Sequence, residues 1–366
     1  MSARHRTPRD GPTPTLARST PYLVVDRTIM EDNIARVHGR LDAVGLSVRP
    51  HVKTHKSPDI AALQLGAGAV GITVATVGEA EVFAGSGCTD IFIAYPVWVD
   101  ADRASRLALL TETARVAIGV ESVEGAEHLA GKLDPRIEVM VEVDSGHHRT
   151  GCEPQHAGDV AAAVVAAGAG FRGLFSFPGH SYAPGAAADV AVAEARALRV
   201  AAHACRAVGL VPSVISGGST PSVAEMSAEI LTEARPGVYV FNDAQQWELN
   251  RCTREDIALT AYGRVVSRRP GRVVVDTGSK VLGGDRAAYA SGYGRLLDHP
   301  TARIVQLSEH HAVVEVPHGQ DLDLGAVLRV VPNHVCIAVN LVDTLTAVAG
   351  NEVAQIWPVA ARGANS

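Results

Sequence analysis

The sequence has few cysteines and no long run of basic residues. Its five cysteines form no Cys-x-x-Cys pair, which excludes a zinc ribbon and argues against a disulfide framework. The formal net charge is −6 at pH 7, which argues against nucleic acid or an anionic membrane as the main partner. We therefore expect a protein of a reducing compartment, the cytoplasm, that binds neither nucleic acid nor membrane.

Long apolar segments are also absent. No stretch is long and uninterrupted enough to span a bilayer, so the sequence predicts no transmembrane helix. Residues 1–18 are rich in Arg, Pro and Thr and lack an apolar core, which is typical of neither a signal peptide nor a membrane anchor. We expect this segment to form a disordered N-terminal tail.

The rest of the composition is that of a globular protein larger than one minimal domain. The chain has 366 residues, of which 47% are hydrophobic and 20% charged. Between residues 27 and 250, short apolar runs alternate with Ala-rich amphipathic runs, and about eight such strand–helix units predict a (β/α)8 TIM barrel. The expected strands are Ser47–Lys53, Gly71–Thr73, Ile91–Ala94, Arg115–Val120, Ile137–Val143, Gly173–Phe177 and Val214–Ser216. The expected helices include Pro58–Gly66, Val77–Gly85, Ala157–Ala167 and Ala187–Val208.

The pattern changes in residues 251–366, where Val-rich runs are closely spaced and separated by Gly, Pro and His. This spacing predicts an all-β domain. A short strand over residues 19–26 is expected to join it. The predicted fold class is therefore α/β plus all-β, a barrel over residues 27–250 followed by a C-terminal β-domain. The expected strands of that domain are Val265–Ser267, Arg272–Asp276, Arg303–Leu307, Ala312–Val316 and Ala326–Val331.

Unusual polar segments follow several of the predicted barrel strands. Barrel enzymes place their chemistry at the carboxyl ends of the strands, and Lys53 ends the first one, where its amine can react with a carbonyl cofactor. The other segments are Asp144–Gly151, Gly179–Tyr182 and Ser216–Pro221. The last of these combines glycines with hydroxyls, which suits a phosphate group, although an ordinary turn has the same composition.

A second chemical feature lies in the predicted β-domain, where His334 and Cys336 are two residues apart. If they lie on a strand, their side chains project from the same face and can bind one metal ion. Imidazole with thiolate favours zinc, and two protein ligands leave open positions, as in a catalytic site. Taken alone, a buried cysteine is usually a small apolar residue.

These segments occur in an order that resembles one enzyme family. They are Thr20 to Asp26, Pro50 to Lys56, Asp144-Ser145-Gly146 with Arg149 and Gly151, Gly217 to Pro221, Arg235 to Tyr239, and Pro332 to Cys336. From residue 19 onward the chain resembles the fold-type III pyridoxal phosphate enzymes. Within them it is most similar to the D-threonine aldolase and D-serine dehydratase branch, which is related to alanine racemase.

The resemblance implies a role for each matching residue. Lys53 would bind pyridoxal phosphate covalently through its amine, and Lys56 would be structural. Arg149 would contact the phenolic oxygen of the cofactor, and Arg235 would face the pyridine nitrogen, as in alanine racemases. The remaining predicted cofactor-binding residues, most of them for the phosphate, are Tyr182, Gly218, Ser219, Thr220 and Tyr239.

The family also suggests a metal. Its dehydratases carry His-x-Cys with zinc, and its aldolases carry His-x-Asp with a manganese-like ion. Cys336 therefore favours zinc and a dehydratase, with manganese as the alternative. The residues Ile337 and Ala338 depart from the Pro-Thr that the family has after the metal ligands.

Two reactions on a D-3-hydroxy amino acid follow from these parts. In the D-serine dehydratase type, Lys53 removes the Cα proton and the β-hydroxyl leaves, giving a 2-oxo acid and ammonia. In the alternative, the D-threonine aldolase type, His180 is the candidate base that takes the hydroxyl proton, and the Cα–Cβ bond breaks to give glycine and an aldehyde. The sequence favours the first through Cys336.

Two further interpretations rank lower. An amino-acid racemase needs a second base, which is a tyrosine in alanine racemases, and the corresponding stretch Asp276–Lys280 contains none. A non-catalytic carrier of the cofactor would resemble barrel proteins that lack the β-domain. The resemblance also implies a homodimer that acts on a small molecule.

Overall fold

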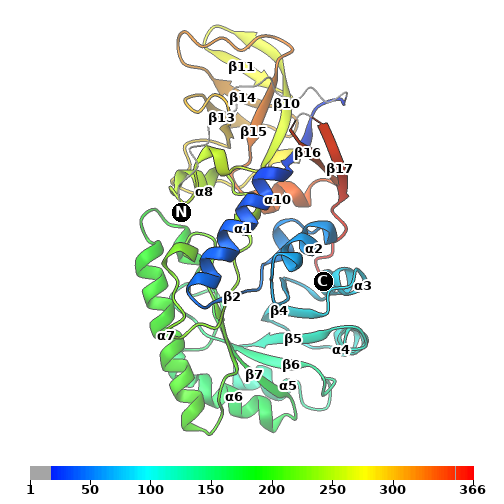
Figure 1. The fold of residues 1–366 in the computed structure, drawn as a ribbon, viewed down its shortest axis with the longest axis vertical. Coiled ribbons are helices and arrows are strands. Elements are labelled where there is room, and N and C mark those ends of the chain that lie inside the picture. The colour runs from blue at the N-terminus through cyan, green and yellow to red at the C-terminus, as the bar shows by residue number, and fades with distance from the viewer. Residues whose placement is uncertain (1–17, 351) are drawn as a thin grey trace. The chain divides into compact units, whose positions relative to one another are not determined.

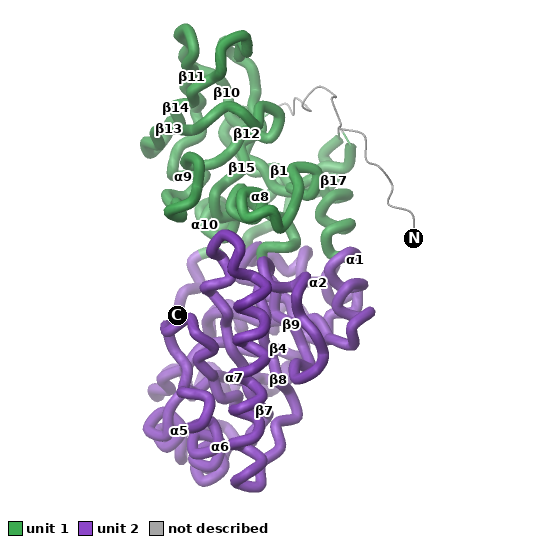
Figure 2. The backbone as a smooth tube through the Cα atoms, turned by 90° about the vertical axis from the view of Figure 1, so that its left-hand side faces the viewer, with its two compact units in different colours: residues 1–34, 238–362 green, residues 35–237, 363–366 purple. Residues whose placement is uncertain are grey.

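The computed structural model describes residues 18–350 and 352–366, which form two compact units. One unit, here the β-unit, holds the described residues up to Ile34 and those from Val238 to Arg362. The other, the barrel unit, holds Ala35–Gly237 and Gly363–Ser366, and Figure 2 colours the two separately. The predicted tail lies outside the described residues except for Arg18, whose guanidinium donates to the Thr346 hydroxyl.

The sheet of the barrel unit confirms the predicted barrel. Its described residues form an eight-stranded parallel sheet in the order β2-β9-β8-β7-β6-β5-β4-β3. A parallel bridge between His51 and Thr73 connects the chain after β2 to β3, so the sheet closes on itself. The strands are β2 (Ser47–Val48), β3 (Ile72–Val74), β4 (Asp90–Pro96), β5 (Arg115–Val120), β6 (Glu138–Glu142), β7 (Gly170–Phe175), β8 (Val214–Gly217) and β9 (Glu233–Ala234).

The barrel helices begin where the sequence supplies capping residues. Thr76, Asp100 and Ser122 each accept a backbone N–H with their side chains at the first turn of α3, α4 and α5. The helices are α2 (Pro58–Gly66), α3 (Val77–Gly85), α4 (Ala101–Leu110), α5 (Val123–His128), α6 (Ala157–Ala166) and α7 (Ala187–Ala207). Figure 1 shows α6 and α7 side by side next to β7. Helix α1 (Arg27–Ala43) contains the boundary between the two units.

The first barrel strand is shorter than predicted. The sequence predicts a strand over Ser47–Lys53, but β2 ends at Val48, and Val52–Thr54 form a turn of 3-10 helix, η1. Pro50 has no backbone N–H to donate to a sheet ladder, which explains why the strand does not continue. Lys53 therefore lies in a tight turn beyond the strand rather than at its last residue.

The β-unit contains a nine-stranded, mostly antiparallel sheet among its described residues. Its strands are β1 (Tyr22–Asp26), β10 (Leu259–Arg269), β11 (Arg272–Val275), β12 (Arg295–Leu296), β13 (Arg303–Leu307), β14 (Ala312–Glu315), β15 (Val327–Val331), β16 (Thr344–Ala349) and β17 (Glu352–Pro358). Its short helices are α8 (Ala244–Glu248), α9 (Ser279–Leu282) and α10 (Val335–Asn340). The strand β1 pairs with β10 and β16, far away in sequence.

The boundaries between the two compact units differ from the domain boundaries predicted at residues 27 and 250. Residues 238–250, which the sequence pattern assigned to the barrel, belong to the β-unit, and Gly363–Ser366 belong to the barrel unit. Alternating apolar runs cannot reveal this division, because Val238–Val240 and α8 are short helical turns like those of a barrel loop. Within the described part of the chain, no helix is long and apolar enough to cross a membrane.

Candidate active site

The turn after β2 presents a lysine without a counter-ion. Lys53 is half-buried, and its Nζ lies 5.7 Å from the ring centre of Phe177. It forms no hydrogen bond or ion pair with another described residue. Lys56, three residues later, is buried and pairs with Glu79 at 3.3 Å, which fits the structural role predicted for it. Lys53 is therefore the amine available for chemistry.

Arg149, from the loop after β6, shares the ring of Phe177 with Lys53. Its guanidinium carbon lies 4.9 Å from the ring centre, and it forms no ion pair with a described carboxylate. Its charge does act on the buried Glu142, where it opposes the rise in pKa that burial causes. Nearby, His51 has a buried Nδ1 without a hydrogen-bond partner, and burial, with the charges of Lys53, Arg235 and Arg149, lowers its pKa well below the ordinary value. Cations that lack counter-ions around a neutral imidazole fit an anionic ligand with oxygen atoms, as pyridoxal phosphate is. The sequence analysis assigned no role to either His51 or Phe177.

Two histidines follow neighbouring strands and stack on each other. His147, after β6, and His180, in the turn η3 (Gly179–Tyr182) after β7, have ring centres 6.2 Å apart and nearly parallel planes. Burial lowers the pKa of both rings, so both are neutral at neutral pH. A Cβ on Gly179 would lie 2.4 Å from Nε2 of His147, so this contact requires glycine there. The sequence analysis selected His180 and missed His147, although both are in polar segments after strands.

The predicted phosphate segment forms a buried group of hydroxyls. The Ser219 hydroxyl lies 2.7 Å from that of Ser181 and 2.9 Å from that of Ser222, and all three side chains are buried. Gly218 has φ of 80°, and a Cβ there would lie 2.4 Å from the Met226 sulfur. Hydroxyls can turn to donate to a phosphate, so this group fits one. Neither Ser181 nor Ser222 was predicted: the fold brings Ser181 beside Ser219 across 38 positions, whereas Ser222 lies only three residues after Ser219 in a local turn.

Two backbone N–H groups of this segment already have hydrogen-bond partners within the protein. The N–H of Gly218 donates to Glu194 at 2.9 Å, and the N–H of Ser219 donates to the Ser222 hydroxyl at 3.0 Å. The cradle of backbone amides suggested by the sequence is therefore not present at these two residues. Of the other predicted cofactor-binding residues, Thr220 is buried and Tyr182 half-buried in the barrel unit, whereas Tyr239 is buried in the β-unit.

Arg235 lies in the interior of the barrel. It is buried over the rings of Phe92 and Phe175, at 5.6 and 5.5 Å. Its guanidinium donates to the Ser216 hydroxyl and to the carbonyl of Ser176. The hydroxyl of Ser216 in turn donates to Glu233 at 2.6 Å. These contacts hold the Arg235 guanidinium in one orientation.

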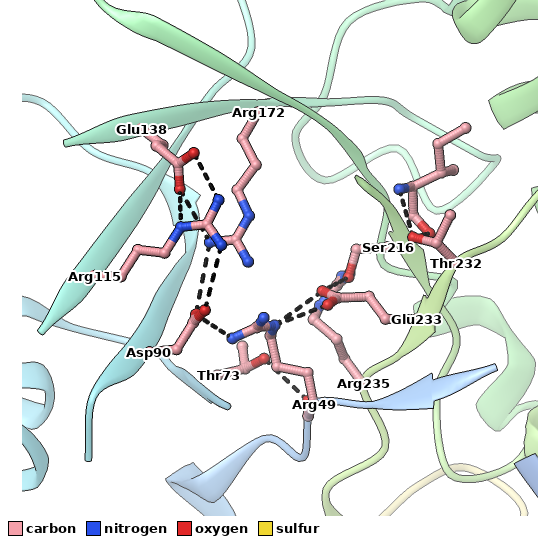
Figure 3. A network of polar contacts seen from close by, with 11 residues as sticks. Arg49, Thr73, Asp90, Arg115, Glu138, Arg172, Ser216, Thr232, Glu233 and Arg235 are labelled. Carbon is pink, nitrogen blue, oxygen red and sulfur yellow. Dashed lines mark hydrogen bonds and ion pairs between the residues drawn. The ribbon is translucent and has the colours of Figure 1, made fainter. Parts of the chain in front are cut away.

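Glu233 belongs to a network of charges at the end of the barrel where the strands begin (Figure 3). Arg49 is buried and pairs with Glu233 at 2.9 Å and with Asp90 at 2.6 Å. Arg172 is also buried and faces Asp90 and Glu138. Asp90, Glu138 and Glu233 are the first residues of β4, β6 and β9, so parallel strands bring them together.

The pair His334 and Cys336 lies in the β-unit, but not on a strand. His334 is the residue before α10, and Cys336 lies in the first turn of that helix. The prediction that they share one face of a strand is thus wrong. The two side chains interact nonetheless: the charge of Cys336 raises the pKa of His334 well above its ordinary value, and Asp243 adds to this against the effect of burial.

The donor set of this pair fits a metal with open positions. An imidazole nitrogen and a thiolate are ligands that zinc prefers. No group of three or more His, Cys, Asp or Glu side chains in residues 18–350 and 352–366 is arranged to hold a metal ion.

Comparison with known proteins also divides the chain into two parts, each of which matches a different family model. The sequence matches the alanine racemase N-terminal domain over residues 25–245 and the putative serine dehydratase domain over residues 258–348. D-threo-3-hydroxyaspartate dehydratase of Delftia sp. (strain HT23) is 33% identical over 93% of this chain and 97% of its own. D-threonine aldolase of Arthrobacter sp. is 34% identical over 95% of this chain and 94% of its own.

The fold is shared as well. The structure of the Delftia dehydratase has a TM-score of 0.86 with this chain at 32% identity, and covers 93% of this chain and 97% of its own. A cysteine-to-alanine variant of that dehydratase has been solved in a metal-free form. The chain thus belongs to the alanine racemase N-terminal domain family of fold-type III pyridoxal phosphate enzymes, in the branch that carries a serine dehydratase-like domain.

Proposed function

We propose that this protein is a pyridoxal phosphate- and metal-dependent lyase that dehydrates D-3-hydroxy amino acids to 2-oxo acids and ammonia. The observation that carries the proposal is the pairing of His334 with Cys336 in a chain whose Lys53 amine has no counter-ion. The substrate class is supported by its relatives, which include a D-threo-3-hydroxyaspartate dehydratase and a D-serine dehydratase.

Each residue then has a defined task. Pyridoxal phosphate, when bound through its aldehyde, withdraws electrons from the bonds at Cα of an amino acid. Lys53 Nζ anchors the cofactor and later takes the Cα proton, while Arg149 and the hydroxyls of Ser181, Ser219 and Ser222 hold oxygen atoms of the cofactor. His334 and Cys336 would hold a zinc ion, which as a Lewis acid helps the β-hydroxyl to leave.

The products follow from the balance of atoms. Loss of the Cα proton and the β-hydroxyl removes one water and gives an enamine, which tautomerises to an imine. Hydrolysis of that imine consumes one water, releases ammonia and leaves the 2-oxo acid. No oxidant or reductant is needed.

The neutral pair His147 and His180 supports a second candidate, retro-aldol cleavage. A base for the hydroxyl proton must be unprotonated at working pH, and burial keeps both rings neutral. A D-threonine aldolase is also among the relatives. In this reaction His180 takes the hydroxyl proton, Cα–Cβ breaks, and glycine and an aldehyde leave.

One experiment separates the two reactions. Cofactor-loaded protein is incubated with D-threonine and zinc or manganese, with L-threonine as the matched control, and the products are identified. We expect 2-oxobutanoate and ammonia, and loss of turnover after chelation. Glycine with acetaldehyde would instead establish the aldolase, and in that case His180→Gln should slow cleavage about 10²–10⁴-fold.

The metal, the assembly and the compartment are also part of the proposal. Zinc is supported by the thiolate ligand, with manganese as the alternative. A homodimer is expected from the family resemblance. The cytoplasm is expected because the cysteines of the described residues form no disulfide. Light scattering of the purified protein measures the assembly directly.

A further inference from the structure

Asp243 is a buried carboxylate that no role described so far requires. Its side chain has no exposed surface, and a carboxylate in such a place needs donors for both oxygens. Oδ1 accepts the N–H of Gln246 at 2.9 Å, which caps α8. Oδ2 accepts the N–H of Val335 at 3.2 Å, at the first residue of α10. The carboxylate therefore connects the beginnings of two helices of the β-unit.

The same Oδ2 atom faces the predicted metal ligand. It lies 3.4 Å from Nδ1 of His334, which makes the two a close pair that falls short of a hydrogen bond. Nδ1 is buried and has no other hydrogen-bond partner among the described residues, whereas the ring as a whole is 24% exposed. The exposed part of the imidazole is therefore not Nδ1, and Nε2 is the nitrogen that a metal ion can reach.

We propose that Asp243 positions His334 for metal binding, by accepting the proton of Nδ1 and so leaving the lone pair of Nε2 for the metal. An ionised carboxylate only accepts hydrogen bonds, so it selects the tautomer with the proton on Nδ1. Histidines that bind metals commonly have such a carboxylate or carbonyl partner on the other nitrogen, and a small rotation of the ring would bring this contact into good geometry.

Asp243 is not a third ligand. Both of its oxygens already accept backbone N–H groups, and it forms no metal-binding group of three with its neighbours in the described residues. It acts through His334 and is therefore a positioning residue. The adjoining backbone supports a rigid arrangement, since the N–H of Ala244 and of Gln245 donate to the carbonyls of Pro332 and Asn333.

The inference rests on the metal site of the proposed function, and its test is the affinity for zinc rather than turnover. Cofactor-loaded full-length protein is stripped of metal with a chelator and then titrated with Zn²⁺ against a chromophoric chelator. We compare the wild type with Asp243→Asn, which keeps an oxygen that can cap α8 but presents no second carboxylate oxygen. The matched control is Asp256→Asn, which removes another carboxylate from a helical cap in the same unit.

We expect Asp243→Asn to bind zinc about 10–100-fold more weakly and Asp256→Asn to bind it as the wild type does. Cobalt substitution adds a spectroscopic readout. The thiolate band of Cys336 should persist in Asp243→Asn, while the visible bands that report the geometry around the metal should change. Equal zinc affinity in Asp243→Asn and the wild type would overturn the inference.

Two further variants keep the result interpretable. If Asp243→Asn fails to fold, Asp243→Ser is used, because serine caps a helix about as well as aspartate and cannot reach His334. It should show the same loss of zinc affinity, and wild-type affinity in it would overturn the inference. His334→Ala should abolish zinc binding; if it binds zinc like the wild type, the metal site of the proposed function is wrong, a failure distinct from that of Asp243.

Discussion

At the end of the barrel where the strands begin, Arg49 and Arg172 are buried and each faces two carboxylates. Beyond the opposite ends of the strands, Lys53 and Arg149 lie around Phe177 and form no ion pair with a carboxylate of the described chain. A buried cation without a partner is costly, so the first end is complete by itself. At the second end Lys53 is half-buried and Arg149 is exposed, so water solvates these charges and leaves them available to a ligand that brings negative charge. We call the first end the stabilising face of the barrel and the second end its chemical face.

The largest expected effect is on the chemical face. Lys53→Ala removes the amine that we propose anchors the cofactor and serves as base, so the visible absorption of the bound cofactor should disappear and turnover should fall about 10⁴-fold. The control is Lys56→Ala, which removes a cation three residues away that pairs with Glu79 and should keep the absorption band. A band that persists in Lys53→Ala would assign the cofactor to another lysine.

On the stabilising face, Arg49→Met should cost about 3–5 kcal/mol of unfolding free energy, because Glu233 loses its buried partner and Asp90 its closest one. Arg115 belongs to the same network but its side chain is 54% exposed, so Arg115→Met should cost about 0–1 kcal/mol. Denaturant midpoints measure both. Similar losses in the two variants would show that burial does not govern the strength of this network.

Acid should weaken the fold through His55, which is buried two residues after Lys53. Burial, opposed by hydrogen bonds with Gln64 and Ser57, lowers the pKa of His55 to about 4, so the folded chain binds fewer protons than the unfolded chain between pH 6.5 and about 4. The neutral ring of His55 makes its full contribution to the free energy of unfolding above pH 6.5. This contribution decreases as the pH falls, and it is lost once the pH has fallen through 4. The loss is about 3 kcal/mol.

The measurement is denaturant unfolding at several pH values for the wild type and His55→Gln. The advantage of the wild type at pH 7 should shrink toward pH 4, because only the wild type has this ring to protonate. An advantage that stays constant with pH would contradict a neutral His55 in the folded chain.

The smallest effect should come from Arg149→Met. Arg149 is exposed, so stability should change by no more than about 0.5 kcal/mol. Loss of one charge-assisted contact should weaken cofactor binding about tenfold, which a titration of the cofactor-free protein with pyridoxal phosphate measures. A large loss of stability with unchanged cofactor affinity would place Arg149 with the stabilising charges instead.

Much of the fold was predictable because its signals are local. The helices Pro58–Gly66 and Val77–Gly85 and the strand Arg115–Val120 were predicted with the bounds they have in the structure. Apolar periodicity and capping residues define such elements within a few turns of chain. The prediction was wrong around Lys53, where Pro50 ends the strand, and at His334, where a helix begins.

The candidate site was predictable only in part. Lys53, Arg149, His334 and Cys336 could be named because they lie in ordered motifs, but the side chains around them could not. Phe177 and His147 meet only because β6 and β7 are neighbours, and Ser181 reaches Ser219 across 38 positions of sequence. Asp243 and His334 are 91 positions apart in number and adjacent in space.

The sequence by itself determined the barrel, the β-sheet and the order of the motifs, since apolar period and turn residues act over short distances along the chain. The tertiary structure alone decided which charges are paired. Arg49 and Lys53 are four residues apart, yet one is buried between Glu233 and Asp90 and the other has no carboxylate partner in the described chain. Pairing depends on which strands become neighbours and on how water is excluded, and both arise only when distant segments pack together.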